Sequence, residues 1–170
     1  MQHTNIEIKA RLKNADLIRQ ILKKNCAEYI GTDNQIDTYF KINKGRLKLR
    51  KGNIEDYLIY YERENQEGPK KSKVILLKNP VSPLEAILKE SLEVLVVVDK
   101  KREIYFIDNV KFHIDSIKNL GNFMEIEAID SDDSIGIERL REQCNFYIDL
   151  FGIKENDLID CSYSDLLLKA

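Results

Sequence analysis

The sequence predicts an α+β fold built on an antiparallel β-sheet. About eight or nine short stretches alternate polar and apolar residues with a period of two, which is typical of strands, and only a few stretches have helical spacing. Several of the predicted strands carry charged side chains on one face and aliphatic side chains on the other. Such a charged face either lies in water or lines a polar cavity, and a cavity requires charges of both signs.

The first half of the chain contains one predicted helix and five predicted strands. Residues 5–12 alternate in character and predict a strand, whereas residues 14–26 place Ala15, Ile18 and Leu22 at helical intervals. Turn-forming residues at 43–45 and 66–69 separate the strands that follow. These strands are expected at 37–41, 45–51, 56–63 and 73–77.

The second half returns to helical spacing at 84–92, after Pro80 and Pro83. Two β-rich stretches, 93–98 and 103–107, are expected to be joined by the charged segment 99–102. Two further strands are expected, then a helix that begins after a capping-type sequence and ends at Gly152, and a last helical stretch. These elements are expected at 110–117, 123–129, 137–151 and 156–168. No linker or repeat separates them, so a single domain is expected over residues 1–170.

Composition excludes some classes of protein. The 170 residues carry a net charge of −2 with a pI near 5.8, whereas binders of nucleic acids and anionic membranes usually have a basic excess. The longest apolar run is too short to span a bilayer, and no signal-peptide pattern opens the sequence. Cys26, Cys144 and Cys161 lack metal-site spacing and are expected to be buried free thiols. A cytoplasmic location is therefore expected.

Cationic side chains recur on the charged strand faces. Arg46, Lys48 and Arg50 share one face of a predicted strand, with neighbours ~6–7 Å apart, where they repel one another unless an anion lies between them. A triphosphate has a suitable length and charge, and a solvated basic face is the alternative. Similar cations occur at Lys9 and Arg63. Lys100 and Arg102 are two positions apart, so they would point to the same side of an extended chain.

Carboxylates occur on the same kind of face. Glu125 and Glu127 alternate with apolar residues and point in one direction, and Glu7 does the same on its own strand. Asp115 shares a face with His113. Proteins bind Mg²⁺ or Mn²⁺ through one or two carboxylates, substrate oxygens and water. Exposed strand carboxylates are the alternative for each residue taken alone, and the combination with several cationic faces favours a metal role.

Short motifs along the whole chain carry a family resemblance. The opening Asn5-Ile6-Glu7-Ile8-Lys9 resembles the Glu-x-Glu-x-Lys start of the CYTH family, also called triphosphate tunnel metalloenzymes. The chain is most similar to the class IV adenylyl cyclase-like branch. The later matches, in family order, are Asp37-Thr38-Tyr39-Phe40, Gly45 to Arg50, Tyr60-Tyr61-Glu62-Arg63, Gly68-Pro69-Lys70-x-Ser72, Lys100-x-Arg102, His113-x-Asp115, Leu120-Gly121-x-Phe123-x-Glu125-x-Glu127 and Ser162-Tyr163-x-x-Leu166-Leu167.

The resemblance implies an antiparallel β-barrel of about eight strands with flanking helices. The interior of this barrel would form a tunnel that holds a triphosphate together with Mg²⁺ or Mn²⁺. By position, it implies metal ligands at Glu7, Glu125 and Glu127, and catalytic roles for Glu7, Lys9, Arg102 and Glu125. The residues implied in substrate binding are Lys9, Arg46, Lys48, Arg50, Arg63, Lys70, Lys100, Arg102, His113 and Asp115.

One position departs from the family pattern. The first Glu of the opening motif is Asn5 in this chain. An amide oxygen can ligate a metal, but it supplies no charge. A weaker metal site or an altered metal preference is therefore expected.

Three functions are consistent with this pattern. The branch resemblance places first a class IV adenylyl cyclase-like enzyme, which would convert ATP to cyclic AMP and pyrophosphate through attack of the 3′-hydroxyl on the α-phosphate. A tripolyphosphatase or thiamine triphosphatase would release orthophosphate instead. A non-catalytic triphosphate-binding module is the third alternative, and Asn5 is the main argument for it. The expected partner is a small-molecule triphosphate, with neither nucleic acid nor membrane, and pairing as a homodimer stays open.

Overall fold

The structure, a computed structural model, describes residues 2–170. Most of the chain is β-sheet, with helices at the start, the middle and the end. The strands are Gln2–Arg11 (β1), Glu28–Phe40 (β2), Arg46–Lys51 (β3), Tyr57–Arg63 (β4), Lys70–Lys78 (β5), Val94–Ile107 (β6), Val110–Ile117 (β7) and Gly121–Asp130 (β8). The helices are Ala15–Lys24 (α1), Leu84–Ser91 (α2), Ile137–Leu150 (α3) and Tyr163–Lys169 (α4), with a 3₁₀ turn, η1, at Glu155–Asp157.

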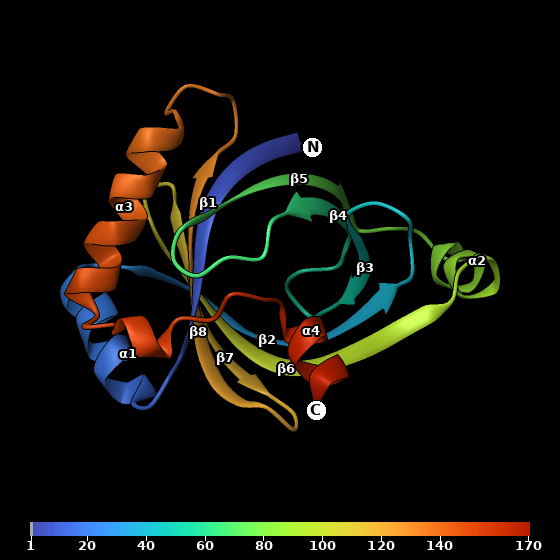
Figure 1. Cartoon of the computed structure of the whole chain (residues 1–170), viewed down its shortest axis with the longest axis horizontal. Helices are drawn as coiled ribbons and strands as arrows, with labels where there is room; N and C mark the ends of the chain where they lie inside the picture. The colour runs from blue at the N-terminus through green and yellow to red at the C-terminus, as the bar shows by residue number, and fades with distance from the viewer. Residues whose placement is uncertain (1) are drawn as a thin grey trace.

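The eight strands close into one antiparallel barrel (Figure 1). Their order around the barrel is β1-β5-β4-β3-β2-β6-β7-β8, and β1 closes the ring by pairing with both β5 and β8. Closure gives every strand two hydrogen-bonded neighbours, so none of the eight is left as a sheet edge. The predicted fold class, an antiparallel barrel with flanking helices, is confirmed.

Much of the apolar core lies outside the barrel wall, between strands and helices, and a second cluster includes Tyr39, Ile59 and Tyr61, which line the barrel interior. Ile6 and Ile8 of β1 point outward and pack with Ile18 and Leu22 of α1. From α3, the buried Leu140 joins the same cluster. Figure 1 shows α1 and α3 together on one side of the barrel and α2 at the far end. Because the helices cover the aliphatic face of these strands, the alternating charged face must point into the barrel.

Three sequence-based expectations about elements are wrong. The segment 99–102 does not join two strands, because β6 runs without interruption from Val94 to Ile107 and its charged residues continue the alternation. The strand expected at 37–41 begins much earlier, at Glu28. The helical stretch expected at 156–168 is divided between η1 and the short α4. In β6, the charged residues Lys100 and Arg102, which face the barrel interior, concealed the continuity of the strand.

The three cysteines are free, as expected, but only two of them are buried. Cys144 lies against β1, where its thiol donates to the Ile6 carbonyl at 3.2 Å, and burial raises its pKa to about 12. Cys26 is exposed, so the expectation of burial is wrong for this residue. It follows the end of α1 with a positive φ of 57°, where the chain turns away from the core.

Within residues 2–170, no helix combines the length and the apolar character that crossing a membrane requires.

Candidate active site in the barrel interior

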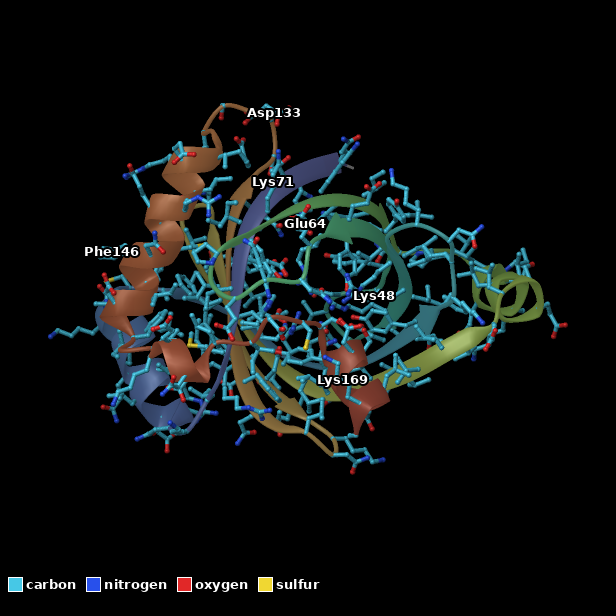
Figure 2. All side chains as sticks on the ribbon, in the orientation of Figure 1. Lys48, Glu64, Lys71, Asp133, Phe146 and Lys169 are labelled. Atoms are coloured by element: carbon cyan, nitrogen blue, oxygen red, sulfur yellow. The ribbon has the colours of Figure 1, made fainter. Side chains whose placement is uncertain are left out.

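The barrel interior is a charged cavity of about 250 Å³. Eight lysine and arginine side chains line it, against four glutamates. Figure 2 shows side chains from all around the ring turned inward, with the labelled Lys48 among them. The lining cations are Lys9, Lys48, Arg50, Arg63, Lys78, Lys100, Arg102 and Lys111, and the carboxylates are Glu7, Glu55, Glu125 and Glu127. The excess of cations suits a polyanionic ligand.

Asp37 of β2 gathers three of these cations. Arg50 binds its carboxylate with two N–H groups, at 2.8 and 3.0 Å, and the ammonium groups of Lys48 and Lys100 lie at 3.0 and 2.5 Å. Burial alone would raise the pKa of this carboxyl, but Arg50, Lys100 and Lys48 hold it well below its usual range. Asp37 therefore stays ionised as the internal counter-ion of the β3 and β6 cations.

Asp37 was not among the predicted site residues. The sequence contained two signals for it: Asp37 begins the motif Asp37-Thr38-Tyr39-Phe40, and it has the same strand parity as Tyr39, which lines the cavity. Its role depends on cations from two other strands, and only the closed barrel reveals them.

Glu125 of β8 is the second centre of charge. Lys9 contacts its Oε1, whereas the Arg102 Nη2 and the His113 Nδ1 both lie 2.9 Å from its Oε2. Arg102 is fixed in turn by Asp115, which accepts from Nε and Nη2 at 2.7 and 2.6 Å. Asp115 thus lies behind Arg102 and orients its guanidinium, and it is not one of the residues that line the cavity.

Tyr163, at the start of α4, completes this cluster, and the sequence-based site did not include it. Its hydroxyl donates to Asp115 at 2.7 Å, and its ring lies under the Lys9 ammonium, which is 3.7 Å from the ring centroid. A capping box at Ser162 and Asp165 fixes the beginning of the helix. Burial raises the pKa of the Tyr163 hydroxyl, so the group remains a donor.

Another part of the cavity wall is organised by the β3–β4 loop. The Asp33 carboxylate accepts from the backbone N–H groups of Asn53, Ile54 and Glu55, at 2.5, 3.0 and 2.9 Å. This anchors Glu55, whose carboxylate accepts from Arg50 at 2.7 Å and also contacts Lys111. Despite burial, Lys111 and Arg50 lower the pKa of Glu55. Sequence reasoning missed Glu55, Asp33 and Lys111, because the first two are separated from the charged strands they serve.

Three adjacent wall positions keep polar atoms without a partner. Arg63 contacts Glu7 through Nη1, but its Nε and Nη2 have no hydrogen-bond partner within residues 2–170. The same is true of Ser72 Oγ and Asn5 Oδ1. Ser72 pairs with Arg63 on one side and with Asn5 on the other. Buried polar atoms without partners are costly, so this row is suited to contact a polar ligand.

A group that could hold a divalent cation lies beside this row. Ligand atoms of His113, Glu125 and Glu127 all lie within 4.8 Å of one another. Glu7 pairs with Glu127 across the β1–β8 ladder. Carboxylate oxygens and imidazole nitrogen are suitable ligands for such a cation, and the buried His113 Nε2 has no partner within the described chain. The residues present therefore fit a divalent metal. His113, expected to bind substrate, joins the two predicted metal ligands Glu125 and Glu127.

Two predicted phosphate-binding residues lie outside the cavity lining. Arg46 donates to Asp165 at 2.9 Å and to Asn65 at 3.0 Å. Lys70 donates to the carbonyls of Gln66 and Ile159, at 3.0 and 2.9 Å, and burial with nearby Arg63 lowers its pKa to about 8. The two cations join the C-terminal segment and the β4–β5 loop to the barrel. Of the other eight residues predicted to bind substrate, seven line the cavity, and Asp115 contacts Arg102 from behind the lining.

A family model for the CYTH domain matches residues 3–162 of this chain. Among solved structures, a protein from Pyrococcus horikoshii OT3 is 27% identical, with a TM-score of 0.75 and coverage of 95% of this chain and 98% of that one. A candidate adenylate cyclase from Vibrio parahaemolyticus is 21% identical, with a TM-score of 0.76 and coverage of 96% and 97%.

A candidate adenylyl cyclase from Hippeastrum that has a dominant triphosphatase activity is 17% identical, with a TM-score of 0.57 and coverage of 96% and 94%. No curated protein matches the sequence. The likeness to the Vibrio and Hippeastrum proteins, at these identities, extends to the fold.

Proposed function

The chain belongs to the CYTH domain family, and from this membership we propose that it is a metal-dependent enzyme that hydrolyses a triphosphate in its tunnel. The observation that carries the proposal is one cavity lined by twice as many cations as carboxylates. A triphosphate would replace the internal counter-ions of these cations. Its negative charge would then be shared among the lysine and arginine side chains that several strands contribute to the cavity wall.

The size of the cavity favours hydrolysis of a compact triphosphate. Sites that enclose a whole drug-sized molecule span roughly 300–1,000 Å³, whereas this cavity has about 250 Å³. An inorganic triphosphate or the phosphate part of a larger substrate suits that volume. The sequence-based expectation placed the cyclase first. We place hydrolysis first because it requires the cavity to hold only the triphosphate, whereas cyclisation also requires it to hold the ribose and base of ATP.

Arg102 and Lys9 have the best-defined role in the proposed reaction. Asp115 holds the Arg102 guanidinium in one orientation, and the Tyr163 ring lies under the Lys9 ammonium. Both cations contact Glu125 and would turn to phosphate oxygens when substrate binds. Fixed donors of this kind stabilise charge that develops in the transition state without reorganisation. A bound Mg²⁺ or Mn²⁺ would polarise a phosphoryl oxygen and neutralise part of its charge.

Cyclisation of ATP is the second candidate. It is supported by the fold shared with a candidate adenylate cyclase and by apolar side chains in the same cavity. Tyr57, Phe106 and Ile129 line the cavity and offer a surface for a nucleobase.

Product analysis tests the two candidates directly. With Mg²⁺ or Mn²⁺ present, tripolyphosphate is expected to release orthophosphate, since the cation-lined cavity binds the anion and orients its terminal phosphorus. The measurement is phosphate release and cyclic AMP formation from tripolyphosphate, thiamine triphosphate and ATP, with a chelator as control. Formation of cyclic AMP without orthophosphate would identify the cyclase. Binding of tripolyphosphate without any product, shown by a raised melting temperature, would identify a binding module.

Replacing Asn5 by glutamate is expected to shift metal activation to lower concentration. Asn5 is buried, faces the cavity and has an amide oxygen without a partner within the described residues, so a carboxylate there would attract a divalent cation. The expected gain is about 1–2 kcal/mol, roughly tenfold in the activating metal concentration. Asn5→Gln, which matches glutamate in length but is neutral, serves as the control. Equal metal curves for the two variants would place position 5 outside the coordination sphere.

A further inference from the structure

The hydrogen bond of His113 assigns the proton on its ring. His113 lies on β7 and is almost fully buried, with Nδ1 2.9 Å from the Glu125 Oε2. A carboxylate oxygen only accepts hydrogen bonds, so Nδ1 carries the hydrogen. A second proton, on Nε2, would add another cation beside Glu125, which already contacts Lys9 and Arg102. Nε2 therefore presents a lone pair.

This lone pair has no partner within residues 2–170, although His113 lines the cavity. A phosphate oxygen cannot satisfy it, because both atoms are acceptors. A divalent cation can, and metal-binding histidines typically donate their other ring N–H to a carboxylate, as His113 does to Glu125. The expected role of His113 in substrate binding therefore does not account for its geometry.

We propose that Nε2 of His113 ligates the divalent cation, and that this nitrogen makes the site select Mn²⁺ over Mg²⁺. The inference rests on the proposed function for the presence of a metal. The Glu127 carboxylate lies close to the same ring, with its Oε1 3.8 Å from Nδ1. Glu125 orients the ring.

The selectivity follows from ligand chemistry. Mg²⁺ is a small, hard ion that binds almost entirely to oxygen and keeps several waters. Imidazole nitrogen suits the transition metals, and affinity for a given mixed site rises from Mn²⁺ to the later divalent ions. With Asn5 where the family motif has a carboxylate, the site also has one negative charge fewer to hold Mg²⁺. A nitrogen ligand compensates for that loss only with a transition metal.

The test is pulsed electron paramagnetic resonance of Mn²⁺ bound to the purified full chain, without triphosphate. Coupling to imidazole nitrogen is expected in the wild-type protein. The chain has only two histidines and both line the cavity, so His3→Asn is a matched control that should keep the coupling. His113→Asn should abolish it and weaken Mn²⁺ binding by about tenfold or more, with a smaller change for Mg²⁺.

Several outcomes would overturn the inference: no Mn²⁺ bound, Mn²⁺ bound without nitrogen coupling, coupling that survives His113→Asn, or coupling that is lost in His3→Asn. Should His113→Asn fail to fold, the wild-type and His3→Asn spectra decide alone. Turnover of tripolyphosphate is measured separately. Metal-dependent turnover without nitrogen coupling rejects only the role of His113, whereas nitrogen coupling without turnover of any triphosphate rejects only the proposed function.

Discussion

Replacing Asp37 by asparagine is expected to lower the free energy of unfolding by about 3–5 kcal/mol, the range for removing one partner of a buried ion pair. Asp37 is the shared counter-ion of Arg50, Lys48 and Lys100, and the asparagine would leave the buried Arg50 and Lys100 and the partly buried Lys48 to repel one another. Urea unfolding monitored by circular dichroism measures the loss.

The same substitution should increase the stabilisation that tripolyphosphate provides, because the anion then supplies the missing negative charge. Asp99→Asn is the matched control, since Asp99 forms an exposed pair with Lys118 at 3.7 Å on the same strand as Lys100, and should cost about 1 kcal/mol or less. A loss of similar size in both variants would show that Asp37 does not neutralise the tunnel cations.

Replacing Glu125 by glutamine is expected to reduce turnover by about a hundredfold or more, the scale for losing one group that organises transition-state charge. The glutamine amide would direct N–H groups at the donors that now surround the carboxylate: Lys9, Arg102 and His113. It would also remove one charge from the group that fits a divalent cation. Steady-state kinetics at limiting and saturating Mn²⁺ give the effect on turnover.

Binding distinguishes this result from simple misfolding. Tripolyphosphate binding to Glu125→Gln should be retained or strengthened, because the phosphate no longer competes with a carboxylate for Lys9 and Arg102. Glu93→Gln, at an exposed pair with Lys41, should leave both activity and binding unchanged. Full activity of Glu125→Gln at limiting metal would contradict its assigned role.

Alternation along single strands accounts for the part of the site that the sequence predicted. Glu7 and Lys9 face the cavity because Ile6 and Ile8 pack under a helix, and the same parity argument places Lys48. Period-two patterns are local, so the sequence reveals which face of a strand is charged. This face turns inward in the structure.

Contacts that cross the barrel could not be predicted in this way. Asp37 and Glu55 acquire their roles from cations on other strands, and Tyr163 reaches Asp115 across 48 positions of sequence. The stretch at 156–168 has helical spacing, yet Ile159 donates its N–H to the Lys9 carbonyl at 2.9 Å and Leu158 forms a bridge with Ala10. Pairing with β1 thus overrides local propensity there, as tertiary contacts often do.

Ion pairing inside the tunnel also implies that the two proposed ligands bind cooperatively. Arg63 contacts Glu7 and Lys9 contacts Glu125, so each pair joins a cation suited to phosphate with a carboxylate suited to metal. A triphosphate that attracts the cations releases carboxylate lone pairs for the metal, and a metal that attracts the carboxylates releases cations for the triphosphate. By thermodynamic linkage, each ligand raises the affinity of the other by the same factor. The tunnel is therefore expected to bind metal and triphosphate together with higher affinity than either alone.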